Sequence, residues 1–276
     1  MNEERSINAQ RELGHYRDKW RLESDGMPFR THSSWLQPVR RGDVPSQLKV
    51  AFEDEERRGA ELMVWWGGDG SARVLAHEGN ALLMERAVGT LSLVEMVRHG
   101  RDKDASRIIC DVAARLHATR TPSLPVLVPL THWFRELEFA ASRYGGVLGR
   151  ASAAARELLS DPQGASVLHG DIHHANILDF GPRHWLAVDP KGLVGERGFD
   201  FANIFCNPDL ETVVGPGRLR RQANVVAEAA GLEYSRLLRW ILAYAGLSAA
   251  WTLEENEHPV LALQVAEIAH AELAAS

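Results

Sequence analysis

The sequence contains little cysteine and no long apolar run. Its two cysteines, Cys110 and Cys206, lie far apart in a chain of 276 residues, so we expect buried, reduced thiols and no disulfide framework. No apolar stretch reaches the length of a membrane span, and the first twenty residues are polar. These absences predict a cytoplasmic protein that does not interact with membranes.

The sequence also lacks an excess of basic residues. Its formal net charge is −6, which argues against a general nucleic-acid partner. A negative balance fits a cationic small-molecule substrate, although many acidic proteins bind nothing cationic. The chain is 45% hydrophobic and 25% charged, as is usual for a globular protein, and its length suits one large domain or two lobes. No feature indicates an obligate protein partner, and the oligomeric state is not readable.

The composition changes part-way along the chain. Before residue 86, short apolar runs alternate with turns around one helical segment at Phe52–Trp66, which predicts a β-rich lobe over residues 1–85. From residue 86 to 276, apolar residues recur mainly at helical spacing, which predicts a larger helical lobe. We therefore expect a bilobal α+β fold with a hinge near Met84–Ala87 and a ligand cleft between the lobes.

Polar residues cluster in the stretch from Val167 to Pro190. Two short apolar runs, 176–178 and 185–188, are predicted to pair as strands around a turn at 181–183. That turn would bring Asp189 back beside Asp171 and Asn176. Two carboxylates and an amide offer the hard oxygens that Mg²⁺ prefers in phosphate sites.

The spacing within this stretch is more specific than its composition. His169-x-Asp171-x₄-Asn176 has the frame of the protein-kinase catalytic loop, in which the Asp deprotonates a hydroxyl and the Asn holds a metal. Asp189 follows a strand-like run, where kinases keep a second metal-binding Asp. The competing interpretation is a polar turn between strands, with histidines that cap backbone groups.

Lys49 lies between apolar residues in the predicted strand 46–50. A lysine there needs an anionic partner, so we expect it to bind phosphate; the alternative is a lysine that snorkels from an edge strand. Its predicted carboxylate partner is Glu56, one turn before the small residues Gly59 and Ala60, with Glu55 as the second choice. Either carboxylate could instead be solvated.

Three histidines, His169, His173 and His174, could suggest zinc. Structural zinc sites usually take four ligands, and no cysteine lies nearby, so we favour loop-supporting hydrogen bonds for His169. His173 is predicted to lie near the phosphate or the acceptor. Glu196 and Asp200 follow Asp189 closely and are predicted to contact the acceptor.

Several segments together resemble the aminoglycoside and hydroxyurea phosphotransferases, in particular the branch that includes streptomycin 6-phosphotransferase. The segments that carry the resemblance are WLQPVRRGDVPSQLKV at 35–50, Arg58-Gly59-Ala60, LLMERA at 82–87, LHGDIHHANIL at 168–178 and VDPKGLVGERGFD at 188–200. The resemblance implies a protein-kinase-like fold. It further implies ATP-dependent phosphorylation of a cationic aminoglycoside, with the 6-hydroxyl of streptomycin as the expected acceptor and antibiotic resistance as the outcome.

The resemblance also implies roles for individual residues. Asp171 would be the catalytic base, Asn176 and Asp189 would hold Mg²⁺, and Lys49, oriented by Glu56, would contact the α- and β-phosphates of ATP. The backbone around Met84, Glu85 and Ala87 would face adenine. No G-x-G-x-x-G precedes Lys49, so Ser33 and Ser34 are expected to cover the phosphates instead.

The sequence departs from protein kinases in ways that argue against a protein substrate. Gly170 stands where the catalytic loop of those enzymes has Arg, Asp189-Pro190 replaces D-F-G, and no activation loop is evident. Hydroxyurea or another small molecule stays open as the acceptor, as does GTP as the donor. From another class, a catalytically silent nucleotide-binding protein is the alternative.

Overall fold

The computed structural model describes residues 2–121 and 123–275, and these group into two compact units. The first unit combines the chain up to Leu91 with two later segments, Thr119–Val126 and Leu178–Gly192; the second takes Ser92–Ala118, Leu127–Ile177 and the chain from Leu193 onward. The two lobes predicted at 1–85 and 86–276 stay a prediction. Each unit is described by itself below.

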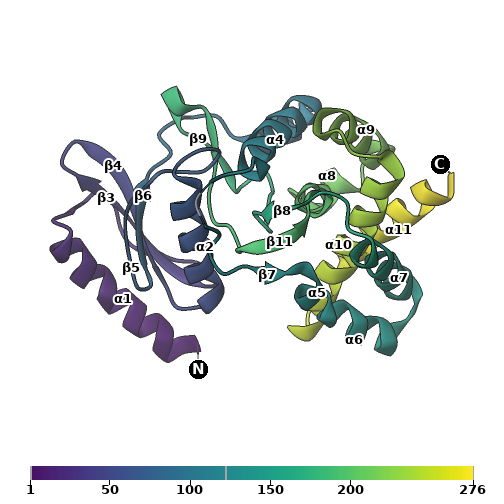
Figure 1. Ribbon diagram of the computed structural model, residues 1–276, viewed down its shortest axis with the longest axis horizontal. Coiled ribbons are helices and arrows are strands. Elements are labelled where there is room, and N and C mark those ends of the chain that lie inside the picture. Colours follow the sequence, from purple (N-terminus) through teal and green to yellow (C-terminus); the bar gives the residue numbers. More distant parts are fainter. Residues whose placement is uncertain (1, 122, 276) are drawn as a thin grey trace. The chain divides into compact units, whose positions relative to one another are not determined.

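The first unit is built on an antiparallel sheet with strand order β1-β3-β4-β6-β5, and β2 also pairs with β3 (Figure 1). Its strands are β1 (Glu23–Ser24), β2 (Phe29–Arg30), β3 (Ser34–Arg41), β4 (Val44–Ala51), β5 (Val74–Glu78) and β6 (Ala81–Glu85). Strands β3 and β4 form a hairpin, in which Lys49 of the predicted strand 46–50 lies opposite Leu36.

Helix α1 (Asn2–Lys19) covers one face of this sheet. Its apolar residues Ala9 and Leu13 belong to the same buried cluster as Leu48 and Val50 of β4. Side chains alternate between the faces of a strand, so Lys49 must point to the face away from α1. The alternation of apolar and polar residues in β4 therefore directs the lysine toward the other helix of this unit.

That helix is α2 (Asp54–Trp66), predicted at Phe52–Trp66. It begins with an acidic turn, which the helix dipole favours, and ends at Gly67 in the left-handed conformation, with φ of 62°. Gly59 lies on its buried face, where an added Cβ would stand 2.0 Å from the carbonyl oxygen of Pro190. The absence of a side chain at Gly59 thus lets the segment that follows Asp189 run directly against α2.

The predicted strand pair in the polar stretch is also present. β9 (Ile177–Asp179) pairs with β10 (Trp185–Ala187), and a 3₁₀ turn at Gly181–Arg183 joins them. Asp189 is the second residue after β10, and its φ of 67° is unusual for a residue with a side chain.

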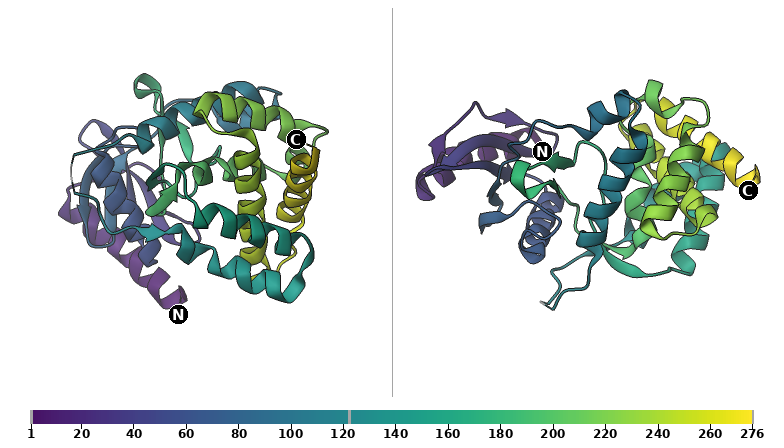
Figure 2. Two further views of the ribbon diagram at one scale, coloured as in Figure 1. Left: turned by 45° about the vertical axis from the view of Figure 1, so that its right-hand side comes forward. Right: turned by 90° about the horizontal axis from the view of Figure 1, so that it is seen from above.

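The second unit is mainly helical. Its helices are α3 (Leu93–Arg98), α4 (Asp102–His117), α5 (Leu130–Trp133), α6 (Arg135–Tyr144), α7 (Gly146–Ser160), α8 (Leu210–Val213), α9 (Arg218–Ala230), α10 (Tyr234–Glu254) and α11 (Val260–Ala275). Most of α10 is buried, as its apolar residues on most faces predicted, and α11 lies alongside it (Figure 2). Aromatic rings of Phe134, Phe199, Trp240 and Tyr244 pack edge-on or tilted around α10.

A small sheet in the second unit was not predicted. Strand β11 (Leu193–Glu196) runs between β7 (Val128–Pro129), which is parallel to it, and β8 (Ala165–Leu168), which is antiparallel. Strands of two to four residues are too short to show a period in sequence. The sheet matters because β8 leads directly into His169 and β11 leads directly into a 3₁₀ turn at Arg197–Phe201.

The fold class is therefore mixed α+β, with a β-sheet part and a larger helical part, as predicted. Among the described residues, no helix is both long and apolar enough to cross a membrane.

Candidate active site

Lys49 of the first unit lies between two carboxylates. Only 8% of the residue is exposed, and its ammonium group contacts Glu56 of α2 and Asp189, which follows β10. Burying an ammonium group is costly unless it is paired, and here it has two anionic partners. The first unit therefore brings together three residues that the sequence analysis assigned to ATP and metal binding.

The charges of this cluster reinforce one another. Burial by itself would lower the pKa of Lys49, but the carboxylates of Asp189 and Glu56 outweigh it and raise that pKa. Burial would likewise raise the pKa of Asp189, but Lys49 and Lys191 outweigh it and hold that pKa well below its usual range. The lysine is thus charged, and Asp189 is a carboxylate, at any physiological pH.

Glu56 is the partner that the sequence favoured over Glu55. One of its oxygens contacts Lys49, and the other accepts a hydrogen bond from the Ser33 hydroxyl at 2.7 Å and lies 3.1 Å from the Lys191 ammonium. Glu55 instead lies 3.1 Å from Lys191. The loop before β3, through Ser33, is thereby tied to the same carboxylate as Lys49.

The other residues predicted to contact the nucleotide have varied surroundings. Met84 lines a small cavity of about 10 Å³ together with Lys49 and Asp189. The Glu85 carboxylate accepts from the backbone N–H of Arg73 at 2.6 Å and also contacts Arg183. Ser34 is fully buried, and its hydroxyl oxygen has no hydrogen-bond partner among the described residues. Ala87 is half-buried in the irregular segment after β6.

In the second unit, Asp171 stands in the loop that follows β8. Gly170 precedes it with φ of 87°, a conformation that explains glycine where protein kinases have arginine. One carboxylate oxygen of Asp171 accepts from the Asn203 amide at 2.8 Å, and the other accepts from the Asn176 amide at 3.1 Å. Asn176 also donates to the backbone carbonyl of Asp171 at 3.0 Å. Both oxygens of Asp171 are thus held by amide donors.

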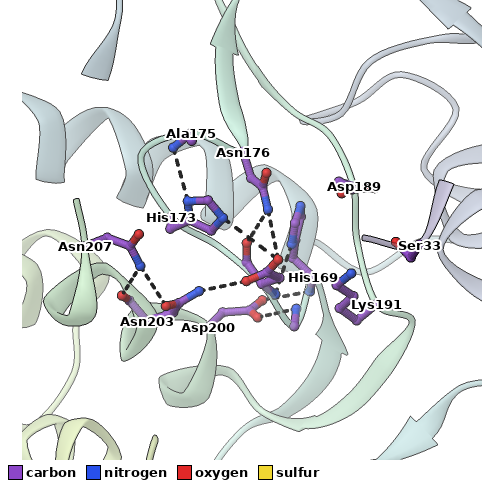
Figure 3. Close-up of polar contacts among 12 residues, drawn as sticks. Ser33, His169, His173, Ala175, Asn176, Asp189, Lys191, Asp200, Asn203 and Asn207 are labelled. Carbon is purple, nitrogen blue, oxygen red and sulfur yellow. Dashed lines mark hydrogen bonds and ion pairs between the residues drawn. The ribbon is translucent and has the colours of Figure 1, made fainter. Parts of the chain in front are cut away.

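Asp200 supports the same loop by accepting hydrogen bonds from its backbone. Its two oxygens accept the backbone N–H groups of His169 at 2.9 Å and Gly170 at 2.7 Å (Figure 3). One of these oxygens also lies 2.8 Å from the His117 ring. Only 1% of Asp200 is exposed. Its predicted contact with the acceptor stays a prediction, but this geometry favours a structural role.

Glu196 is placed in a similar way at the end of β11. It is 2% exposed, and its carboxylate accepts from Arg236, from the Trp240 indole and from the backbone of Gln163. Burial would raise the pKa of Glu196, but the bonds from Arg236, Gln163 and Trp240 outweigh it and lower that pKa. This residue, too, has its oxygens occupied within the protein.

The three histidines have different surroundings. Among the described residues, no three His, Cys, Asp or Glu side chains are grouped so that they could hold a metal ion together. The ring of His169 accepts the backbone N–H of Asp171 at 3.2 Å, which is a loop-supporting bond of the predicted kind. A nitrogen of the His173 ring lies 3.9 Å from the Asp171 carboxylate. Burial, Arg218 and His173 lower the pKa of His174 to about 3.

The residues predicted to hold Mg²⁺ have the donor atoms for it. Asn176 directs its amide N–H groups to Asp171, which leaves the amide oxygen as the atom for a metal. Asp189 keeps 37% of its side chain exposed despite its contact with Lys49. The amide oxygen in the second unit and the carboxylate in the first are each a donor type that suits Mg²⁺, and their joint binding of the ion stays a prediction.

The comparison with known families decides the assignment of this chain. The model of the aminoglycoside/hydroxyurea antibiotic resistance kinase family matches residues 19–256. The chain belongs to this family. It is a small-molecule phosphotransferase, as the sequence predicted.

Two curated relatives of this kinase are similar to it in sequence over most of their length. The chain is 50% identical over 244 residues to a streptomycin 3''-kinase from Klebsiella pneumoniae, covering 87% of this chain and 91% of that protein. It is 31% identical over 271 residues to a streptomycin 6-kinase from Streptomyces griseus, covering 90% of this chain and 84% of that protein. Both of these relatives are named as streptomycin kinases, and they differ in the hydroxyl that their names give.

Solved structures agree on the fold. A thermostable mutant of the aminoglycoside phosphotransferase APH(4)-Ia has a TM-score of 0.67 at 15% identity, covering 93% of this chain and 98% of that one. Another structure of that enzyme, at a TM-score of 0.62, is a ternary complex with AMP-PNP and hygromycin B. The protein-kinase-like fold is thus confirmed for this family member.

Several polar residues of these clusters were not singled out from the sequence of this kinase, among them Lys191, His117, Arg236, Asn203 and Asn207, whose amide donates to Asn203. A signal for two of them exists, because Asn203 and Asn207 are the polar residues in the otherwise apolar run FANIFCN at 201–207. Polar side chains in such a run are expected to be buried and therefore to need hydrogen-bond partners.

Proposed function

We propose that this kinase transfers the γ-phosphoryl group of ATP to a hydroxyl of streptomycin and thereby confers resistance to that antibiotic. The 50% identity to a streptomycin 3''-kinase carries the choice of acceptor and favours the 3''-hydroxyl. The 6-hydroxyl expected from the sequence is the second candidate, supported by the 31% identity to a 6-kinase.

The proposed chemistry assigns Asp171 as the base. Its carboxylate takes the proton of the acceptor hydroxyl as the hydroxyl oxygen bonds to the γ-phosphorus and the bond from that phosphorus to the β–γ bridging oxygen breaks. The products are ADP and the phosphorylated antibiotic. Phosphoryl transfer depends mainly on in-line positioning and charge stabilisation. The protein therefore needs to form no covalent bond to the substrate, and a base held in place is sufficient.

The proposed nucleotide contacts belong to the first unit. The Lys49 ammonium, held by Glu56, binds the α- and β-phosphate oxygens of ATP, and Ser33 orders the loop before β3 over them. Asn176 and Asp189 are the residues proposed to hold Mg²⁺, which would neutralise charge on the phosphates. Met84, Glu85 and Ala87 are proposed to border the adenine. The acceptor is proposed to be cationic, in keeping with the net charge of −6.

The test is a phosphorylation assay with ATP and Mg²⁺. Streptomycin, a 2-deoxystreptamine aminoglycoside and hydroxyurea serve as separate acceptors, and the position of the new phosphate is read by phosphorus–proton correlation NMR. We expect a 3''-phosphate on streptomycin. Product at the 6-position would support the second candidate, and phosphorylation of hydroxyurea alone would overturn both.

The catalytic assignment is tested in the same assay by Asp171→Asn. Loss of a general base costs about 10²–10⁴-fold in rate, so we expect a fall in kcat of that size with ATP binding retained. The matched control is Asp111→Asn, at an exposed position on α4, and it should behave as the wild type. Binding of ATP without turnover of any acceptor by the wild type would instead support the silent nucleotide-binding alternative.

A further inference from the structure

Two asparagines, Asn207 and Asn203, form a hydrogen-bonded row that ends at the Asp171 carboxylate. Asn207 donates its amide N–H to the Asn203 side-chain oxygen at 2.9 Å and to the Asn203 backbone carbonyl at 3.0 Å (Figure 3). Asn203 in turn donates to an oxygen of Asp171 at 2.8 Å. Both asparagines come from the segment after β11, about thirty residues along the chain from the loop that they support.

The row has a direction. An amide side chain has one accepting and one donating end, so the end that faces Asp171 depends on what binds the other end. Because Asn207 donates to the oxygen of Asn203, the Asn203 nitrogen must point to Asp171. Asn203 is only 6% exposed, so water has little access to replace either bond.

The two oxygens of Asp171 have different hydrogen-bond partners, and only one of them is bonded to this row of asparagines. The first receives the Asn203 amide at 2.8 Å, and the second receives the Asn176 amide at the longer distance of 3.1 Å. Asn203 therefore fixes one oxygen and helps to fix the plane of the carboxylate, while the second oxygen faces Asn176 and the His173 ring, 3.9 Å away. The Asp171 side chain is 27% exposed, so an acceptor hydroxyl can reach its carboxylate.

We propose that Asn203 is a positioning residue that orients the Asp171 carboxylate for proton abstraction, with Asn207 setting the direction of the Asn203 amide. The inference rests on the role of Asp171 as the base under the proposed function. Asn203 does not touch the acceptor; its effect passes through Asp171.

The main test compares two substitutions of Asn203 in the streptomycin phosphorylation assay. Asn203→Ala frees the carboxylate to rotate, and misplacement of a reacting group by about 1 Å costs about 10²-fold, so we expect kcat to fall about 10- to 100-fold. The KM values for ATP and streptomycin should change less than about twofold, since neither substrate contact is lost. Asn203→Asp keeps the shape but replaces the donor by an acceptor, so it should lose at least as much activity as Asn203→Ala.

A role in packing alone predicts the opposite order, because Asp fills the space that Ala leaves empty. An Asn203→Asp variant close to the wild type in kcat would therefore overturn the inference. So would an Asn203→Ala variant whose loss appears in KM instead of kcat. Asn224→Ala, at an exposed asparagine on α9, is the matched control for the substitution itself.

Two further variants keep the test decisive. If Asn203→Ala does not fold, Asn207→Ala tests the same row and should lower kcat by a smaller factor, because Asn203 keeps its own bond to Asp171. In the Asp171→Asn background, Asn203→Ala should have no further effect on the residual rate, whereas independent roles would multiply. Failure of the proposed base gives a different result, since Asp171→Asn would then keep its activity.

Discussion

Glu196 offers the sharpest test of what the structure adds, because its sequence position predicted an acceptor contact and its surroundings favour a structural one. Its carboxylate lies 2.7 Å and 2.5 Å from two nitrogens of the Arg236 guanidinium, 2.7 Å from the Trp240 indole nitrogen and 2.8 Å from the backbone nitrogen of Gln163. The side chains of Glu196 and Arg236 are 3% and 12% exposed. The pair therefore joins β11 to α10 inside the second unit.

The perturbation is Glu196→Gln, which keeps the shape and removes the charge. Removal of one partner from a buried ion pair costs about 3–5 kcal/mol, because the other charge stays buried without compensation. We expect the free energy of unfolding in urea at pH 7 to fall by about that amount. The KM for streptomycin, measured well below the unfolding transition, should stay unchanged.

An exposed pair provides the matched control. Arg150 and Glu267 also make two contacts of 2.8 Å, but their side chains are 38% and 56% exposed. Exposed pairs contribute about 0–1 kcal/mol, so Glu267→Gln should have little effect. If Glu196→Gln costs no more than Glu267→Gln, or if it raises the KM for streptomycin, the structural interpretation is wrong.

The stability contributed by Glu196 also depends on pH in a definite direction. The pKa of this carboxyl is lower in the folded protein than its ordinary value of 4.5, so its contribution is fully present above pH 4.5. As the pH falls below that value, the unfolded chain takes up the proton first and the contribution is lost. The difference in unfolding free energy between the wild type and Glu196→Gln should therefore shrink below pH 4.5.

Three further predictions concern the first unit and the thiols. Lys49→Met removes the cation between two carboxylates and should lower kcat/KM for ATP about 10²–10³-fold in steady-state assays. Gly59→Ala places a Cβ 2.0 Å from the Pro190 carbonyl oxygen and should lower the free energy of unfolding by about 1–3 kcal/mol, measured in urea. Burial raises the pKa of both Cys110 and Cys206 to about 12, so neither thiol of the native protein should react with iodoacetamide at pH 8, as read by intact mass.

Each of these has a control in the same chain. Lys103→Met, at an exposed lysine, should leave the ATP kinetics unchanged. Gly149→Ala, in α7 where an added Cβ meets nothing within 4 Å, should stabilise the protein, so a loss equal to that of Gly59→Ala would contradict the contact with Pro190. Both thiols should react once the chain is unfolded in guanidinium; rapid alkylation of the native protein would show that they are accessible.

Local pattern was enough to predict much of this protein. The alternation in β4 directs Lys49 to one face, the acidic first turn of α2 supplies Glu56 one strand-to-helix connection later, and both follow from periods of two and 3.6 residues. The spacing from His169 to Asn176 likewise defines a loop whose residues contact one another over a few positions. The family resemblance carried by these segments was confirmed by the comparison with known sequences.

Tertiary structure decided what supports those residues. The bonds from Asn203 to Asp171, from Asp200 to the backbone of Gly170 and from Arg236 to Glu196 each join groups thirty or more positions apart. Such pairs depend on how β8, β11 and α10 pack, and no local period records that packing. The sequence alone therefore determined the reactive groups and the faces on which they lie. The packing of the helical unit decided which carboxylates stay partly exposed and which accept hydrogen bonds within the protein instead.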